Sequence, residues 1–169
     1  MKKGAKAILY GCLATAVVLT AVTTASLMNK KSVAHAEPET TITVLISSIE
    51  NKDGRLLLKA DPIAWYQGDE ANKIFAERDP EGAAEIGGVP DGYYIVNDDK
   101  TETTYELSDQ AEVLMQLLNP KEIKWNEEIS VSQFVEVMDH KENYDQTVFP
   151  YHLTLKDGKV VKVVQQYLP

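Results

Sequence analysis

Two hairpin signals place the strongest limit on how this chain can fold. Each consists of two strand-like segments, rich in β-branched residues, on either side of an Asp-Gly dipeptide: Thr41–Ile49 with Arg55–Ala60, and Tyr151–Leu155 with Val160–Tyr167. Asp53-Gly54 and Asp157-Gly158 supply the positive φ angles that tight hairpin turns need. Hairpins near both ends of the chain predict a domain built mainly from antiparallel strands.

The segments between the hairpins combine strand and short-helix patterns. Asp61-Pro62 is predicted to end the second strand, and residues 69–78 to form a short helix with acids at its N-terminal end. This helix is predicted to end at Asp79–Gly82, and Ala83–Pro90 to form a loop. Tyr93–Val96 and Thr103–Leu107 are predicted to be paired strands around a turn at 97–100. Ser130 and Gln133 are predicted to cap a further helix. Residues 108–118 fit a helix, and a buried strand nearly as well.

Together these elements predict a β-rich α+β fold with two or three short helices. We expect a small antiparallel, OB-like β-barrel or a strongly curved sheet. Residues 37–40 are expected to be a flexible lead-in, and residues 41–169 a single β-rich extracellular domain. A domain of about 133 residues buries roughly two-thirds of its unfolded surface, which is enough for a core without disulfides.

The first 36 residues have the pattern of an export segment. They carry five lysines and no acid, and an uncharged run covers residues 7–28. Ala34 and Ala36 have the small side chains that signal peptidase requires, so a signal peptide over residues 1–36 is predicted, with cleavage after Ala36. The alternative is an uncleaved anchor through residues 7–28, which could cross a bilayer core of about 30 Å. Both predict a domain that is secreted or lies on the extracellular face of the cell envelope.

The charge of the remaining chain excludes several classes of partner. Residues 37–169 contain 12 basic and 26 acidic side chains, a net charge of −14. Such a surface repels nucleic acid and anionic lipid, so membrane contact is expected only through residues 7–28. The single cysteine, Cys12, lies in the export segment. Its loss on cleavage would exclude disulfides and thiol chemistry.

Four stretches resemble a group of small exported proteins of Gram-positive bacteria. Asp61–Ala71 contains an Asp-Pro-x-x-Trp motif, and Asp91–Asn97 contains a Tyr-Tyr-Ile-x-Asn motif. Ile129–Met138 is the predicted capped helix, and the closing hairpin ends in Tyr-Leu-Pro at Pro169. The resemblance implies an exported β-rich domain. It supplies no catalytic residue.

The sequence contains no recognisable catalytic constellation. His140 and His152 are the only histidines after residue 36, and no serine has a nucleophile-elbow motif around it. His152 is expected to be a partly exposed strand residue, and His140 to lie at a helix end. No transition-metal spacing is present, so no catalytic residue is assigned.

Calcium is the one metal for which the composition offers ligands. The densest oxygen-bearing cluster is Asn97, Asp98 and Asp99, with Glu102 nearby. Calcium takes carboxylate and amide oxygens, but Asn and Asp also favour turns for backbone reasons. We therefore predict a turn here, with calcium binding as the alternative.

Aromatic residues give the only sign of a binding surface. Trp65 and Tyr93 are expected in the core, and their neighbours Tyr66 and Tyr94 on a ligand-binding face, because adjacent strand residues point in opposite directions.

The sequence predicts an exported, non-enzymatic binding domain whose partner is an envelope protein or a cell-wall component. One alternative is a hydrolase acting on cell-wall material through carboxylates, which would require an acid titrating near neutral pH. Another is an acidic extracellular domain stabilised by calcium.

Overall fold

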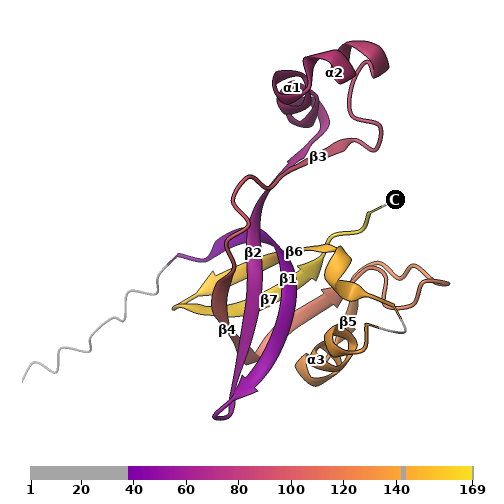
Figure 1. Ribbon diagram of the computed structural model, residues 1–169. Coiled ribbons are helices and arrows are strands. Elements are labelled where there is room, and N and C mark those ends of the chain that lie inside the picture. The colour runs from indigo at the N-terminus through magenta and orange to yellow at the C-terminus, as the bar shows by residue number, and fades with distance from the viewer. Residues whose placement is uncertain (1–37, 142–143, 169) are drawn as a thin grey trace, which may run out of the picture. The chain divides into compact units, whose positions relative to one another are not determined.

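The computed structural model describes residues 38–141 and 144–168 (Figure 1). The predicted signal peptide, with Ala34 and Ala36, lies outside the described residues. Within the described part of the chain, no helix has the length and hydrophobicity required to span a membrane.

Five strands close into a barrel in the order β1-β2-β4-β7-β6 (Figure 1). Their bounds are Thr40–Lys52 for β1, Arg55–Gln67 for β2, Thr103–Met115 for β4, Pro150–Lys156 for β6 and Lys159–Gln165 for β7. The OB-like barrel is therefore confirmed. It is mixed rather than purely antiparallel, because β4 and β7 run parallel. A parallel pair needs a long crossover, which the chain between β4 and β7 provides.

Both Asp-Gly hairpins are confirmed. Asp53 and Gly54 have φ angles of 54° and 77°, and Asp157 and Gly158 have φ angles of 49° and 78°. Two successive positive φ angles match the right-handed twist of the flanking strands. These turns fix the β1–β2 and β6–β7 registers.

The predicted break at Asp61-Pro62 is wrong, since β2 continues to Gln67. On one side β2 pairs with β1 through Ile63, with Val44 opposite Pro62. On the other side, pairing with β4 ends at Ala60 and pairing with β3 begins only at Ala64. Within the described residues, Pro62 therefore lies where β2 has one neighbouring strand, the setting in which a strand tolerates proline.

Residues 64–99, here called the lobe, contain two helices and a short strand. The helices are α1 (Gly68–Arg78) and α2 (Pro80–Ile86), and the strand is β3 (Tyr93–Val96), which pairs with the end of β2. The loop predicted for residues 83–90 is partly wrong, because Asp79 accepts a hydrogen bond from the Gly82 N–H and Pro80 opens α2. The predicted pairing of Tyr93–Val96 with Thr103–Leu107 is also wrong.

The ambiguous segment 108–118 extends the barrel, because β4 runs on to Met115. Its alternating residues Ala111, Val113 and Met115 are buried. A short strand that was not predicted, β5 (Glu127–Ile129), pairs with its end. The predicted capping box is confirmed, since Ser130 and Gln133 cap α3 (Val131–Asp139), and the 3₁₀ helix η1 (Gln146–Val148) precedes β6.

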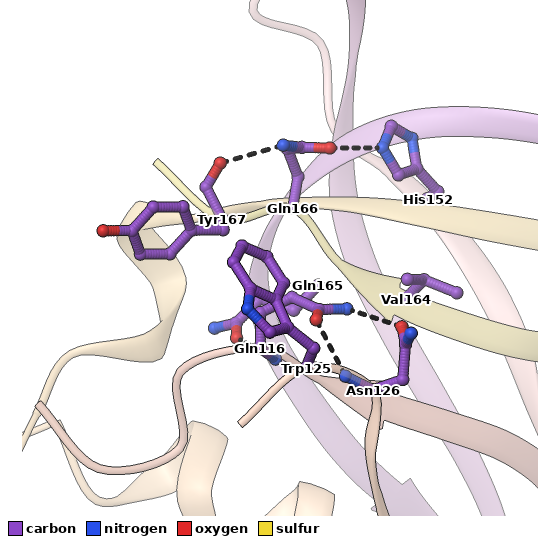
Figure 2. Close-up of a pocket in the computed structure, with 8 residues that line it drawn as sticks. All are labelled: Gln116, Trp125, Asn126, His152, Val164, Gln165, Gln166 and Tyr167. Carbon is purple, nitrogen blue, oxygen red and sulfur yellow. Dashed lines mark hydrogen bonds between the residues drawn. The ribbon is translucent and has the colours of Figure 1, made fainter. Parts of the chain in front are cut away.

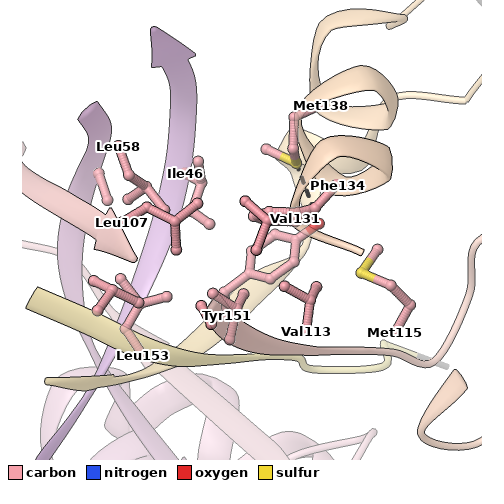
Figure 3. Close-up of a cluster of buried hydrophobic side chains, with 14 of the residues drawn as sticks. Ile46, Leu58, Leu107, Val113, Met115, Val131, Phe134, Met138, Tyr151 and Leu153 are labelled. Carbon is pink, nitrogen blue, oxygen red and sulfur yellow. Dashed lines mark hydrogen bonds between the residues drawn. The ribbon is translucent and has the colours of Figure 1, made fainter. Parts of the chain in front are cut away.

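The core lies inside the barrel and beneath α3 (Figure 3). Phe134 of α3 is fully buried and meets the Tyr151 ring edge-on, with 5.8 Å between ring centroids. The Tyr151 hydroxyl donates to the Gln146 carbonyl at 2.9 Å. Burial raises the pKa of Tyr151, so the phenol stays neutral and keeps this bond.

Candidate functional site

A hollow of about 250 Å³ opens where β4 and β7 end and β6 begins (Figure 2). It is lined by Gln116, Trp125, Asn126, His152, Val164, Gln165, Gln166 and Tyr167. None of these residues is Asp, Glu, Lys or Arg, in a domain that is otherwise rich in acids. The hollow, here called the amide pocket, thus combines the Trp125 and Tyr167 rings with amide and imidazole groups that can donate and accept hydrogen bonds.

Buried glutamines fix the floor of the amide pocket. Gln165 is 1% exposed, and its Oε1 accepts from the backbone N–H groups of Gln116 and Leu117 at 2.9 and 2.8 Å. Its Nε2 donates to the Oε1 of Gln146 at 2.6 Å, and the Gln146 Nε2 donates to the Leu117 carbonyl at 3.1 Å. Because buried amides are costly without partners, this network fastens the end of β4 to β7.

Gln116 holds the loop that carries the exposed aromatic ring. Its Nε2 donates to Asn126 Oδ1 at 3.0 Å, and its Oε1 accepts from the Asn126 backbone N–H at 2.9 Å. Asn126 has a φ of 56°, a left-handed conformation that Asn tolerates better than most residues. The two bonds hold this turn and fix the backbone that carries Trp125.

Trp125 is the largest exposed apolar group at the pocket. It is 67% exposed, the highest fraction among the large exposed hydrophobic residues of the described chain. Its indole meets the Tyr167 ring edge-on, with 5.5 Å between centroids and an interplanar angle of 73° (Figure 2). A tilted aromatic contact is favourable, so Tyr167 supports the indole while most of its surface remains open.

A hydrogen-bonded chain forms the other side of the pocket. His152 contacts Thr43 Oγ1 through Nδ1 at 2.9 Å and Gln166 Oε1 through Nε2 at 3.1 Å. Since the Gln166 Nε2 donates to the Tyr167 carbonyl, the Gln166 Oε1 is the acceptor and His152 Nε2 carries the proton. The prediction of a partly exposed strand histidine is confirmed, but its hydrogen bonds place it beside a pocket.

The face that OB-folds commonly use for ligands has only short loops in this chain. That face lies on the second and third strands and the loops after strands one and four. In this chain the two loops are the Asp-Gly turns. The hollow between β2 and β4 contains Arg55, Glu106, Asp109 and Lys159, and Lys159 pairs with Glu106 at 2.6 Å. The amide pocket therefore differs from it in both position and charge.

Tyr66 and Tyr94, the predicted ligand-binding residues, form a cross-strand pair in the lobe. Both are half-buried, and the Tyr94 ring lies 5.4 Å from that of Phe75 in α1. Their side of the β2–β3 ribbon thus packs against a helix. Ligand binding by these two residues stays a prediction.

Trp65 and Tyr93 do not join the barrel core, contrary to expectation. Their rings stack on each other, with 4.6 Å between centroids and an interplanar angle of 13°. Both are half-buried. The difference arises because β2 leaves the barrel after Ile63, so its later residues pack within the lobe.

The predicted calcium residues bind separate partners. Asp98 receives two hydrogen bonds from Arg78, at 2.8 and 2.6 Å, and Asn97 donates to Asp61 at 2.6 Å. Asp99 accepts from the Thr101 hydroxyl, and Glu102 lies near Lys59. Over residues 38–141 and 144–168, no three His, Cys, Asp or Glu side chains are placed to hold a metal ion together. Calcium binding stays the untested alternative to a turn.

The shifted carboxyl groups are ion-paired or hydrogen-bonded. Hydrogen bonds and charge from Lys59 lower the pKa of Glu50, and Lys159 lowers that of Glu106 in the same way. A general acid of a glycan hydrolase would need the opposite shift. His140 is the C-cap of α3, which confirms its predicted place at a helix end.

Trp125 and the amide pocket were not predicted from the sequence. The available signal was a tryptophan between Lys124 and Asn126 in a mostly polar stretch. The pocket itself depends on contacts between residues 116–126 and residues 165–167, which no local pattern encodes. The sequence matches no family model, no curated protein and no solved structure.

Proposed function

We propose that this protein is an exported, non-enzymatic binding domain of the bacterial cell envelope, and that the amide pocket is its ligand-binding site. The observation that carries the proposal is the exposed Trp125 indole beside a neutral, hydrogen-bonding hollow. The export pattern of residues 1–36 supports the location.

A binding role explains why an indole remains exposed on a braced loop. A tryptophan side chain contributes about 150–250 Å² of contact area. Covering the exposed part of Trp125 would be worth about 2–4 kcal/mol, at roughly 25 cal/mol per Å². Tryptophan is also enriched among the residues that dominate binding energy. The glutamine network lowers the cost of binding, because a braced loop loses little freedom when a ligand arrives.

Capture of envelope material tests the proposal. Full-length protein, purified in mild detergent and immobilised, is challenged with solubilised bacterial envelope, and the captured material is identified by mass spectrometry. Trp125→Ala should lower capture about tenfold or more, as expected for a loss of roughly 2 kcal/mol.

Ile86→Ala is the matched control, since Ile86 is also apolar and 55% exposed but lies in α2. This variant should capture as the wild type does. Equal capture by wild type and Trp125→Ala would place any binding elsewhere. No specific capture by the wild type would remove the binding function.

A further inference from the structure

The chemistry of the amide pocket narrows the class of ligand. Among the described residues, no Lys, Arg, Asp or Glu lines this pocket, so it lacks the fixed opposite charge that strengthens the binding of a phosphate, a carboxylate or a cation. Lys124, next to Trp125 in the chain, is already paired, since its Nζ lies 3.5 Å from Glu122 and 3.4 Å from Glu127. The pocket is therefore suited to an uncharged ligand.

Two amide side chains of the pocket keep N–H donors for a ligand. Asn126 Oδ1 and its backbone N–H are held by Gln116. Among the described residues, no hydrogen-bond partner meets the Asn126 Nδ2. Gln166 donates one of its two amide hydrogens to the Tyr167 carbonyl, and the other remains available to a ligand. Both donors belong to residues that line the same hollow as Trp125.

We infer that the ligand is an uncharged sugar ring of a glycan, which stacks on Trp125 and accepts hydrogen bonds from Asn126 and Gln166; this inference rests on the proposed function. A sugar ring presents one face of C–H groups to an aromatic ring and a rim of hydroxyls to polar groups. Trp125 supplies the flat apolar surface, and the amides supply the donors. The hollow of about 250 Å³ is smaller than most drug-sized sites, so it suits one ring of a chain.

The test is calorimetric titration of the full-length protein in mild detergent with defined trisaccharides. The neutral probes are N-acetylchitotriose, cellotriose and maltotriose. Trigalacturonic acid tests for an acidic glycan, and an end-capped tri-alanine peptide tests for a neutral peptide. At least one neutral trisaccharide should bind saturably, and more tightly than the acidic sugar or the peptide.

Two variants assign the binding to the pocket. Trp125→Ala should weaken trisaccharide binding about tenfold or more. Asn126→Asp should do likewise, because it removes the N–H donors and adds a negative charge, while Asp keeps an acceptor for Gln116 and tolerates the left-handed backbone. Asn119→Asp is its matched control: it makes the same charge change at an exposed residue of the same loop and should leave binding unchanged. Circular dichroism melts check that each variant is folded.

Several results would overturn the inference. These are no binding of any neutral trisaccharide, tighter binding of the acidic sugar or the peptide, or unchanged sugar binding in both pocket variants. If Trp125-dependent capture of envelope material persists without trisaccharide binding, the sugar inference falls and the proposed function stands. If Trp125-dependent capture is also absent, both fall.

Discussion

The barrel and the lobe differ in whether their buried polar atoms have hydrogen-bond partners. In the barrel, Gln116, Gln146 and Gln165 are buried, and each makes side-chain hydrogen bonds to its neighbours. Where β2 passes into the lobe, Asp61 Oδ1, Asn97 Oδ1 and Trp65 Nε1 are buried without a partner among the described residues. Because each unmade hydrogen bond costs stability, and two of these three residues belong to the lobe, we expect the lobe to be the less stable of the two regions.

The same contrast holds for apolar burial and charge. Of the residues in α1 and α2, only Ala71 and Phe75 are buried, whereas the barrel strands and α3 share a continuous core. The lobe also carries nine acidic and two basic side chains, half of the net charge of −14 after residue 36. We therefore expect a rigid barrel that supports the amide pocket and a lobe that opens locally first.

The largest loss of stability should come from a substitution in the barrel core. Phe134→Ala removes a fully buried ring beneath α3 and should lower the free energy of unfolding by about 3–5 kcal/mol. Urea denaturation measures the change. Val148→Ala, at a residue 57% exposed, should change stability by less than about 0.5 kcal/mol. A similar small loss for Phe134→Ala would contradict the assignment of the core.

Removing the centre of the glutamine network should cause the second-largest loss of stability. Gln165→Leu deprives two backbone N–H groups of their acceptor and should cost about 2–4 kcal/mol. It should also loosen the loop of Trp125, which makes the indole more accessible to acrylamide quenching. Gln110→Leu, on an exposed strand residue, is the control. Unchanged stability in Gln165→Leu would show that the network is not structural.

The lobe should respond locally to loss of its own anchor. Phe75→Ala removes the ring against Tyr94 and should destabilise the lobe by roughly 2 kcal/mol, below the core value because the lobe can relax around the gap. Amide hydrogen exchange should speed up over residues 64–99 and stay unchanged in β1, β6 and β7. Equal acceleration in both regions would show that the lobe and the barrel unfold as one unit.

The smallest effect concerns the ion pair of the lobe. Hydrogen bonding and charge from Arg78 lower the pKa of Asp98. A lowered folded-state pKa adds stability at neutral pH that is lost as the pH falls through that pKa, and solvent exposure keeps the contribution small. In Arg78→Gln, the pKa of Asp98 followed by NMR should rise, while Glu50, paired with Lys59, keeps its lowered pKa. An unshifted Asp98 in this variant would exclude the pair in solution.

Local sequence signals predicted the elements that are locally determined. The Asp-Gly turns define both hairpins, and Ser130 with Gln133 defines the start of α3. The pattern failed where a distant partner decides the structure. Pro62 remains in a strand because, among the described residues, β1 alone pairs with β2 at that position, and residues 112–114 form a strand because β7 pairs with them.

The amide pocket also depends on partners that are distant in the sequence. Its rigidity arises from hydrogen bonds between residues almost 50 positions apart, such as that from the Gln116 N–H to Gln165. Nothing in the local sequence distinguishes Gln165 from the exposed Gln110. Trp65 and Tyr93 were expected in the core because large aromatic residues are usually buried, but the exit of β2 from the barrel carries them into the lobe.

The most direct test of the central claim follows Trp125 itself during binding. The chain has two tryptophans, so Trp65→Phe leaves Trp125 as the only indole and keeps a ring to stack on Tyr93. If the amide pocket is the ligand site, solubilised envelope material should shift the Trp125 fluorescence to shorter wavelength, saturably, and protect it from acrylamide. An unchanged emission spectrum and unchanged quenching, while the same protein demonstrably captures envelope material, would show that the ligand binds elsewhere.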